Sequence, residues 1–481
     1  MLSRPEDQQS LKNQVITRES TSETTTLKAA ISRHIEKERV SFHIPGHKGR
    51  IRFDLSERFL SYDLTELPGL DDLSNPSGVL ADLERRTAKI WGVHSSILSV
   101  SGATGALIAT MIMLARRGSH VLVPRNCHRS IVNALVLTGL EPIWYEPVWE
   151  EAWGVWGPVT GNIIASALKA SRQENLAGVV VVSPSYVGAI SELKKIASVC
   201  HENGLPLLVD EADGAHCLLP ETAELSALNC GADLVVHSLH KTIGALTQTG
   251  VAHISKGGAA SFSFTPEELR TTLNLVQSSS PSYIFLSSID ERISALESGE
   301  CAAELRELER LGQILRRHVK QLKHISVYEP IFGALNSGVM LGCPNIDALD
   351  ELLMQQGIYS EIIVRPGLLL LLGIGSNEND VNFLLQALKE FDKSLTPNPG
   401  NAAGSPPSNR PEPIEQVLSP RQAFYMPSRV VSVAEAIGEI AVECVAPCPP
   451  GWPVTIPGQK IKASQLRGLN LPSVRVVVQP S

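Results

Sequence analysis

The sequence has 481 residues, 43% of them hydrophobic and 19% charged, which is enough for more than one domain with a buried core. The formal net charge is -8 and no long basic run occurs, which argues against nucleic acid as the main partner. No apolar stretch reaches the roughly 18–20 residues of a membrane span, and the N-terminus lacks the apolar core of a signal peptide, so we expect a cytoplasmic protein that does not bind membranes.

The eight cysteines are too sparse for a disulfide framework in a chain of this size. Cys444 and Cys448 are close together in the sequence, but neither a second pair nor a nearby histidine completes a zinc site. We therefore expect reduced thiols and no bound metal.

The chain begins with polar segments. Residues 1–26 are rich in Ser, Thr, Gln and Glu, a composition typical of a mobile tail. From Leu27 to Arg39 apolar residues recur at helical spacing, which predicts an amphipathic helix. Two stretches follow, HIPGHKG at 43–49 and DLTELPGLDDL at 63–73, that crowd histidine, glycine, proline and acids into loops. This composition suits a site better than a core.

The polar residues of these two loops allow more than one interpretation. His43, His47 and Lys48 either line a site or cap local turns, and the sequence leaves this open. Asp71 and Asp72 are more typical of solvated loop positions than of direct substrate contact.

Helix and strand signals alternate from Leu80 onward. A helix that runs to Leu114 opens with the small residues Ser99–Ala106, where backbone N–H groups can approach a phosphate, although small residues also occur there simply for packing. Apolar runs such as Gly178–Val182, separated by helices such as Ser191–Asn203, indicate a mostly parallel sheet covered on both faces. No strong GxGxxG turn and no GxxxxGK[ST] loop occurs, so nucleotide binding has little support.

Two apolar runs end in reactive side chains. The run Leu205–Val209 is followed by Asp210, and the run Ala232–Val236 is followed by Lys241. Parallel strands bring their carboxyl ends to one edge of the sheet, where open α/β sheets bind ligands. Pyridoxal phosphate (PLP) requires a lysine that forms a Schiff base and an aspartate that pairs with the pyridine nitrogen. We therefore predict these roles for Lys241 and Asp210.

The second half of the chain changes character near Thr265. Longer helices are predicted at Pro266–Leu275 and Ala303–Leu322, and short strands near Ser326–Tyr328 and Ile358–Tyr359 belong to a smaller α+β domain. Ser278–Tyr283 is by composition a solvated turn, and Glu361 is expected at a solvated loop position.

A stretch dominated by Pro, Gly, Asn and Ser follows and predicts a linker. The domains predicted in this way are a tail (1–26), an N-terminal segment with a large cofactor-binding domain (27–264), a small α+β domain (265–395), a linker (396–416) and a C-terminal domain (417–481).

Seven motifs in order resemble the Orn/Lys/Arg decarboxylase family, in its shorter form without a receiver-like N-terminal domain. They are HIPGHKG, DLTELPGLDDL, RNCHRS, VDEADGAH, SLHKT, SPRQAFY and CPPGWPVTIPGQ. The resemblance implies an α/β protein of PLP fold type I, with a mostly parallel central sheet and at least a homodimer as the assembly. It also implies decarboxylation of arginine, lysine or ornithine, in polyamine or cadaverine formation.

The resemblance also implies roles for single residues. Lys241 would hold PLP, Asp210 would pair with the pyridine nitrogen, and His128 would stack on the ring. The implied phosphate ligands are Ala103, Thr104, Ser238 and His240, with Ser279 and Ser280 reaching the phosphate of the neighbouring subunit. Lys241 or His240 would return a proton to the substrate's α-carbon, and the sequence does not decide between them.

Three residues depart from the family pattern. Asp213 stands where short members usually carry histidine, Cys448 replaces a tyrosine, and Gln459 replaces a glutamate. If that glutamate binds the distal cation of the substrate, Gln459 weakens a charge-assisted contact, so the preferred substrate stays open.

Two other functions therefore also stay open. One is a different PLP reaction on the same fold, such as transamination or elimination, and the other is a weakly active relative with a binding or regulatory role.

Overall fold

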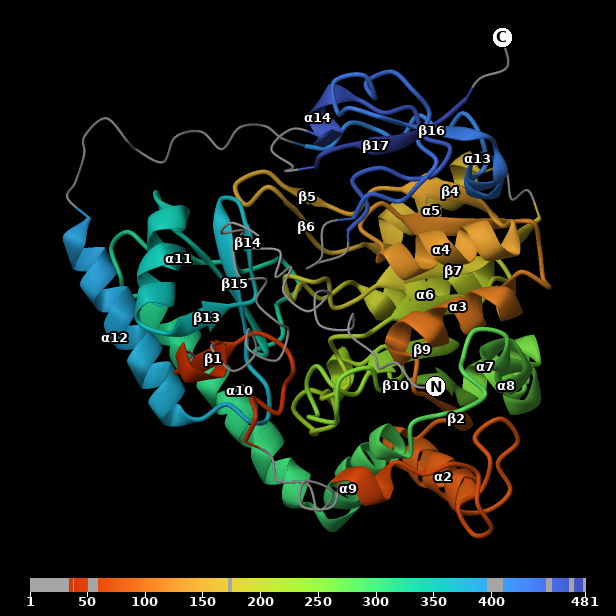
Figure 1. Ribbon diagram of the computed structural model, residues 1–481, viewed down its shortest axis with the longest axis horizontal. Coiled ribbons are helices and arrows are strands. Elements are labelled where there is room, and N and C mark those ends of the chain that lie inside the picture. Colours follow the sequence, from red (N-terminus) through yellow and green to blue (C-terminus); the bar gives the residue numbers. More distant parts are fainter. Residues whose placement is uncertain are drawn as a thin grey trace, which may run out of the picture. The chain divides into compact units, whose positions relative to one another are not determined.

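The computed structural model describes residues 34–37, 39–50, 59–171, 175–395, 410–446, 452–466 and 471–478 (Figure 1). The expected tail at 1–26 and most of the helix expected at Leu27–Arg39 lie outside the described residues. Of the unit that ends at Arg39, residues 34–37 are helical. A second unit begins at Val40 and contains the sheets described below.

Within the described ranges, the apolar runs form a seven-stranded sheet of order β2-β10-β9-β8-β7-β3-β4. Strands β9, β8, β7, β3 and β4 are parallel to one another, whereas β10 is antiparallel to both of its neighbours. The strands are β2 (Ser95–Ser99), β3 (His120–Pro124), β4 (Glu141–Tyr145), β7 (Leu176–Val182), β8 (Leu207–Asp210), β9 (Leu234–Ser238) and β10 (Gly250–Ile254). The predicted mostly parallel sheet is confirmed, and β2 and β10 are additions that the sequence did not predict.

Helices bury both faces of this sheet. Successive side chains of a strand point to opposite faces, so each strand contributes to both cores. Val180 and Val181 of β7, for example, belong to different hydrophobic cores. One face packs against α3 (Gly102–Leu114), α4 (Arg129–Thr138) and α8 (Pro266–Asn274). The other face packs against α5 (Gly161–Ala170), α6 (Leu193–Glu202), α2 (Val79–Trp91) and α9 (Tyr283–Ser298). The strands that alternate with helices in the sequence therefore form one sheet with a layer of helices on each face (Figure 1).

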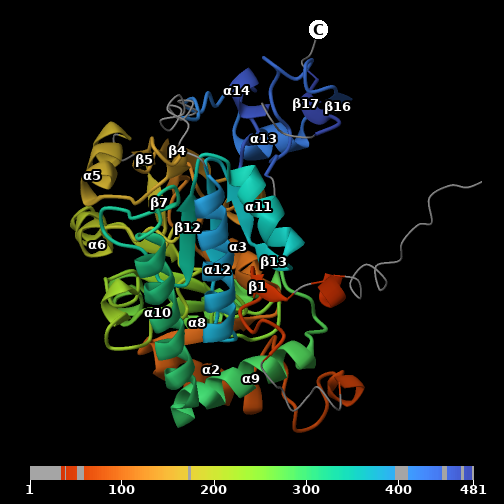
Figure 2. The ribbon, with the colours of Figure 1, turned by 90° about the vertical axis from the view of Figure 1, so that its left-hand side faces the viewer.

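A second sheet has four antiparallel strands, and three helices pack against it. Figure 2 shows α10, α11 and α12 together, and their side chains share one core with this sheet. The elements are β11 (Ser326–Val327), β12 (Gly338–Gly342), β14 (Ile362–Val364), β15 (Gly367–Leu371), α10 (Glu300–Val319), α11 (Ile346–Gln355) and α12 (Glu378–Ser394). The predicted helices at Pro266–Leu275 and Ala303–Leu322 correspond to α8 and α10.

The remaining described elements are short. They are β1 (Val40–Phe42), η2 (Phe59–Tyr62), β5 (Trp149–Glu150), β6 (Val155–Trp156), η3 (Ala223–Leu225), α7 (Lys256–Phe262), β13 (Ile358–Ser360), α13 (Pro420–Tyr425), β16 (Ser428–Val431), α14 (Ala463–Leu466) and β17 (Val474–Val477). Strand β1 pairs in parallel with β13, so a segment near the start of the chain is joined to a strand more than 300 residues later. The sequence predicted β13 but not its partner.

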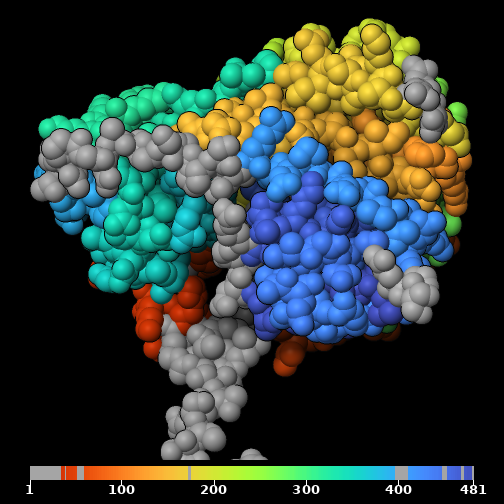
Figure 3. All heavy atoms as spheres, turned by 90° about the horizontal axis from the view of Figure 1, so that it is seen from above, coloured from red at the N-terminus to blue at the C-terminus, as the bar shows by residue number. Residues whose placement is uncertain are grey.

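C-terminal residues pack against the large sheet. Figure 3 shows them in blue beside the orange and yellow residues of the first half of the chain. The buried Arg125 donates from Nη1 to the carbonyl of Pro453 at 2.7 Å, and Arg421 of α13 donates to the carbonyl of Leu137 at 3.1 Å. Trp144 donates from its indole to Gln416 at 3.2 Å. These contacts hold the segment that contains Trp452 next to the large sheet.

The HIPGHKG loop passes between the two larger sheets at a point with no room for a side chain. Gly46 donates its N–H to the carbonyl of His240 at 2.9 Å and accepts from the N–H of Gly375 at 3.0 Å. A Cβ on Gly46 would lie 2.3 Å from the carbonyl oxygen of Lys241. This close approach explains the glycine, because any larger residue must displace the backbone of the turn that carries Lys241.

We expect Gly46→Ala to destabilise the protein by about 1–3 kcal/mol, the usual range for overpacking, and to weaken cofactor binding by moving the Lys241 turn. The measurements are the thermal unfolding midpoint and cofactor affinity. Gly257→Ala is the matched control, because a Cβ there meets only ordinary contacts and lies in α7, where alanine is favoured over glycine. Equal midpoints and affinities for Gly46→Ala and the wild type would refute this account of the loop.

The carboxylate of Asp71 anchors the start of α2. It accepts backbone N–H groups from Ser77 at 2.9 Å, Gly78 at 2.7 Å and Leu80 at 3.0 Å. Although burial tends to raise its pKa, these hydrogen bonds lower the pKa to about 2. Asp71 is thus a partly exposed loop residue, as expected, and its carboxylate also stabilises a helix start.

Replacing Asp71 with alanine should cost about 1–2 kcal/mol of stability near neutral pH. Because the pKa is lower in the folded state, this contribution is present above the ordinary carboxyl pKa of about 4 and is lost as the pH falls toward 2. The difference in unfolding midpoint between Asp71→Ala and the wild type should therefore shrink in acid. Asp63→Ala, at an exposed carboxylate of the same loop, should show neither effect. A difference that is constant with pH would contradict the assignment.

Candidate active site

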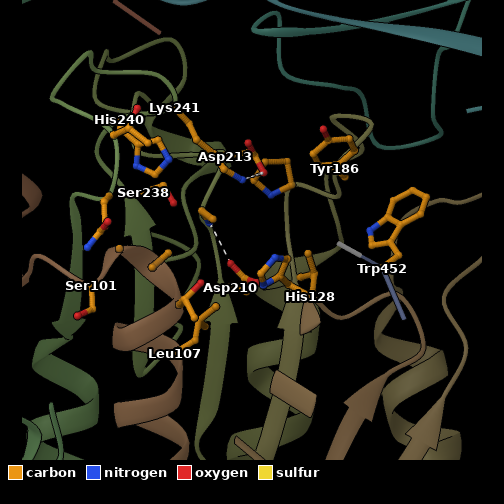
Figure 4. A pocket seen from close by; sticks show the side chains of 18 of the residues that line it. Ser101, Leu107, His128, Tyr186, Asp210, Asp213, Ser238, His240, Lys241 and Trp452 are labelled. Carbon is orange, nitrogen blue, oxygen red and sulfur yellow. Dashed lines mark hydrogen bonds and ion pairs between the residues drawn. The ribbon is translucent and has the colours of Figure 1, made fainter. Parts of the chain in front are cut away.

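Lys241 and Asp210 lie at one cavity at the carboxyl edge of the large sheet (Figure 4). Strand β8 ends at Asp210, and the parallel neighbour β9 ends at Ser238, three residues before Lys241. The cavity has a volume of about 370 Å³, within the range of small-molecule sites. Residues that directly follow neighbouring parallel strands meet at one edge of the sheet, which we call the strand-end rule. It brings together Lys241 and Asp210, the two residues that the sequence analysis selected.

The other predicted site residues of the same chain line this cavity too. They are Ala103, Thr104, His128, Ser238 and His240. Ser279 and Ser280 are exposed and are not among the lining residues, so their expected contact with a neighbouring subunit stays a prediction.

The first-turn residues of α3, Ala103 and Thr104, present a helix N-terminus to the cavity. The first N–H groups of a helix have no partner within the helix and favour a bound anion. Ser238 adds a hydroxyl at the end of β9. This corner of the cavity has the donors that a phosphate group requires.

Lys241 pairs directly with Asp213, not with Asp210. Its Nζ lies 3.0 Å from Oδ2 of Asp213, and both side chains are partly buried. Burial alone would lower the pKa of Lys241, but Asp213, followed by the charge of Asp210, raises it above its ordinary value. The amine is therefore held as an ammonium group.

Asp210 is buried, and burial raises its pKa to about 6 even though Lys241 favours the charged form. Its Oδ1 accepts the N–H of Ala212 at 3.2 Å. A buried carboxylate facing a cavity is costly without a cationic partner, so this position suits a protonated ring nitrogen.

Both cavity histidines are neutral near pH 7. Burial and the nearby Lys241 lower the pKa of His128 to about 4, and its Nδ1 accepts the N–H of Ser130 at the start of α4 at 3.2 Å. Burial also lowers the pKa of His240 to about 4. Nδ1 of His240 lies 3.0 Å from the carbonyl of Thr249, which only accepts, so its single proton is on Nδ1 and engaged there.

Several lining residues were missed by the sequence analysis. Tyr186 and Trp452 meet edge to face with ring centroids 5.9 Å apart, and the hydroxyl of Tyr186 donates to Oε1 of Glu361 at 2.6 Å. Glu361, a partly exposed loop residue, also accepts the N–H of Ile44 at 3.0 Å, a contact that the sequence did not predict. Tyr186 follows the end of β7, and the strand-end rule that selected Asp210 applies to it as well.

Gln459 lies away from the cavity. It is fully buried, its Oε1 accepts the N–H of Ile456 at 3.2 Å, and it is not a lining residue. The side chain of Gln459 therefore closes its own turn, and its effect on a contact with the distal cation of the substrate stays a prediction. Cys448 lies outside the described residues.

His43, His47 and Lys48 are not lining residues of this cavity. Lys48 instead donates from Nζ to the carbonyl of Leu371 at 3.0 Å. No group of three or more His, Cys, Asp or Glu side chains in the described part of the chain is placed to hold a metal ion. None of the helices among those residues is both long and apolar enough to span a membrane.

The residues present fit PLP. The amine of Lys241, the buried carboxylate of Asp210 and the helix start at Ala103 converge on one cavity. Oδ1 of Asn126, another lining residue, is buried without a hydrogen-bond partner among the described residues. A polar ligand in this cavity would satisfy that atom.

Comparison with known proteins identifies the family. The family model described as "Orn/Lys/Arg decarboxylase, major domain" matches residues 25–336. The chain belongs to the Orn/Lys/Arg decarboxylase family. It is 30% identical to an arginine decarboxylase of Halalkalibacterium halodurans, with 93% of each chain covered, and 30% identical to one of Bacillus subtilis, with 91% of each covered.

Solved structures agree on the fold of this decarboxylase family member. The constitutive lysine decarboxylase of Escherichia coli superposes with a TM-score of 0.72 at 17% identity, covering 94% of this chain and 81% of the other. A serine palmitoyltransferase of Sphingomonas wittichii, at 15% identity, gives 0.56 over 74% of this chain and 86% of the other. The protein has PLP fold type I, and as a family member it is a PLP-dependent amino acid decarboxylase, a carboxy-lyase.

Proposed function

We propose that this protein decarboxylates arginine, lysine or ornithine to the corresponding amine and CO2, in polyamine or cadaverine formation in the cytoplasm. The observation that carries the proposal is the placement of Lys241 and Asp210 at adjacent strand ends on one cavity. Full-length relatives named arginine decarboxylases support the substrate class.

We assign a separate role toward the cofactor to each of these cavity residues. Lys241 would hold the aldehyde carbon of PLP, Asp210 would keep the proton on its ring nitrogen, and His128 would supply a stacking surface for the ring. Four lining residues at the start of α3 and in the turn after β9 would hold its phosphate: Ala103, Thr104, Ser238 and His240. When bound, PLP supplies an electron sink for the pair left at the α-carbon as CO2 departs.

Lys241, not His240, returns the proton to the α-carbon. The only proton of neutral His240 is on Nδ1 and is engaged with the carbonyl of Thr249. Lys241, once free of the cofactor, stands beside Asp213 and so stays protonated near neutral pH. An acid in catalysis must carry its proton at the working pH, and of the two candidates Lys241 meets this condition.

Acidic side chains around the cavity favour a basic substrate. Asp213 contacts Lys241, and Glu361 is close enough to raise the pKa of that lysine through its charge. Side chains with negative charge attract a substrate that has a second cation, whereas they repel an acidic one.

The test is incubation of the PLP-loaded protein with arginine, lysine and ornithine separately, with CO2 measured and each product identified by mass. We expect at least one substrate to give its amine and CO2 in equal amounts. Keto-acid formation without CO2 would instead identify a transaminase. Bound cofactor with negligible turnover on all three would identify a regulatory relative.

We also propose a homodimer or a larger homo-oligomer, in which Ser279 and Ser280 reach the cofactor phosphate of the neighbouring subunit. Their exposure in the single chain leaves them available for this contact. If so, the double variant Ser279→Ala/Ser280→Ala binds PLP more weakly although both residues lie outside the cavity of their own chain. Sedimentation of the cofactor-loaded protein as a monomer would refute the proposal.

A further inference from the structure

The ion pair between Lys241 and Asp213 occupies the place where the cofactor must attach. The two side chains lie 3.0 Å apart, and both line the cavity. Asp213 is in the turn after β8, three residues beyond Asp210, so this turn carries two carboxylates that face one amine.

The groups that surround Lys241 leave its ammonium form strongly favoured. Three carboxylates act on it, namely Asp210, Asp213 and Glu361. The histidines nearby, His128 and His240, are neutral at pH 7. Asp213 is the carboxylate with a direct hydrogen bond to Nζ, whereas the carboxylate of Glu361 is bonded to Tyr186 and Ile44.

Covalent attachment requires the opposite state of the amine. The ammonium group must first lose one proton, to Asp213 or to water. The lone pair of Nζ then forms the bond to the aldehyde carbon, and the two remaining hydrogens leave with the aldehyde oxygen as water. A partner that stabilises the ammonium form therefore slows attachment at any pH below the pKa of the lysine.

We propose that Asp213 is a positioning residue that keeps Nζ of Lys241 protonated and turned toward its own carboxylate until PLP arrives. It thereby sets the rate and the pH dependence of cofactor attachment. This inference rests on the proposed role of Lys241 as the cofactor lysine.

The experiment mixes cofactor-free protein with PLP over a range of pH and follows the visible absorbance with time. Reduction with borohydride and mass spectrometry then identify the lysine that carries the cofactor. An adjacent opposite charge shifts a pKa by about 1–3 units. For Asp213→Asn we therefore expect attachment at pH 7 to be about 10-fold faster than in the wild type, with the rate profile moved down by about one pH unit or more.

Matched variants separate the ion pair from general effects of charge. Asp213→Glu should attach PLP at a rate near that of the wild type, because the carboxylate is retained. Glu361→Gln removes a carboxylate without direct contact to Nζ and should shift the profile by less than Asp213→Asn. Asp213→His provides a second variant without a carboxylate if Asp213→Asn folds poorly, as judged by its unfolding midpoint.

Two results would overturn the inference in distinguishable ways. If Asp213→Asn and Asp213→His attach PLP to Lys241 at the wild-type rate with the wild-type pH profile, Asp213 has no control over attachment and the proposed function is untouched. If borohydride labels no peptide containing Lys241 even in the wild type, the proposed function itself fails.

Discussion

Lys241→Ala should bind PLP without a covalent link, lose the visible absorption band of the attached cofactor, and lose turnover by about 10⁴-fold or more, as for other covalent catalytic groups. The substitution removes both the amine that holds the cofactor and the acid that returns the proton. The fold should persist because the side chain lines a cavity rather than filling a core. Absorbance, CO2 release and circular dichroism measure the three effects.

Lys256→Ala is the control for this prediction. Lys256 is an exposed residue at the start of α7, so its replacement removes a lysine without touching the cavity. It should leave the absorption band and turnover as in the wild type. Turnover of Lys241→Ala at the wild-type rate would remove Lys241 from the mechanism.

Asp210→Asn should lower turnover by about 10²–10³-fold while PLP remains attached, the range seen when one preorganised electrostatic group is lost. A neutral amide in that position no longer favours the protonated ring nitrogen, so the carbanion at the α-carbon is poorly stabilised. Single-turnover kinetics should show the loss in the CO2-releasing step rather than in substrate binding.

The same variant should be more stable than the wild type when no cofactor is bound. Burial raises the pKa of Asp210 to about 6, so its carboxyl group contributes fully to stability below the ordinary pKa of about 4, and this contribution is lost as the pH rises through about 6. Asparagine does not ionise. Cofactor-free Asp210→Asn should therefore gain in unfolding midpoint relative to the wild type between about pH 4 and pH 7.

Asp392→Asn gives the contrasting pattern. Asp392 is a buried carboxylate of α12 that accepts the backbone N–H groups of Lys323 and His324 at 3.1 and 2.7 Å, far along the chain from the cavity residues. Its replacement should lower stability and leave turnover nearly unchanged. If Asp210→Asn behaved like Asp392→Asn, with full turnover and lower stability, Asp210 would be a structural residue.

The sequence predicted the parts of the site that local patterns determine. Apolar runs marked β8 and β9, and residues directly beyond a parallel strand must lie at the carboxyl edge of the sheet. The local sequence pattern is therefore sufficient to place Lys241 and Asp210 at the same site. The small residues at the start of α3 carried a second local signal, and the helix that begins at Gly102 places Ala103 and Thr104 at the cavity.

Features that depend on distant partners could not be predicted in this way. Strand β10 is set by pairing with β9 and β2, and β1 by pairing with β13, neither of which is encoded in the local pattern. The local sequence around Glu361 indicates only a loop carboxylate, because its partners Tyr186 and Ile44 are distant in the sequence. Gln459 belongs to a motif that indicated the cofactor site, yet its side chain accepts a hydrogen bond from its own loop.

The central claim is that one cofactor ring lies between Lys241 and Asp210, and a crystal structure of the PLP-loaded protein tests it most directly. We predict continuous density from Nζ of Lys241 to the aldehyde carbon, with the ring nitrogen within hydrogen-bond distance of the Asp210 carboxylate. A ring bound elsewhere, or one whose nitrogen faces away from Asp210, would contradict the account.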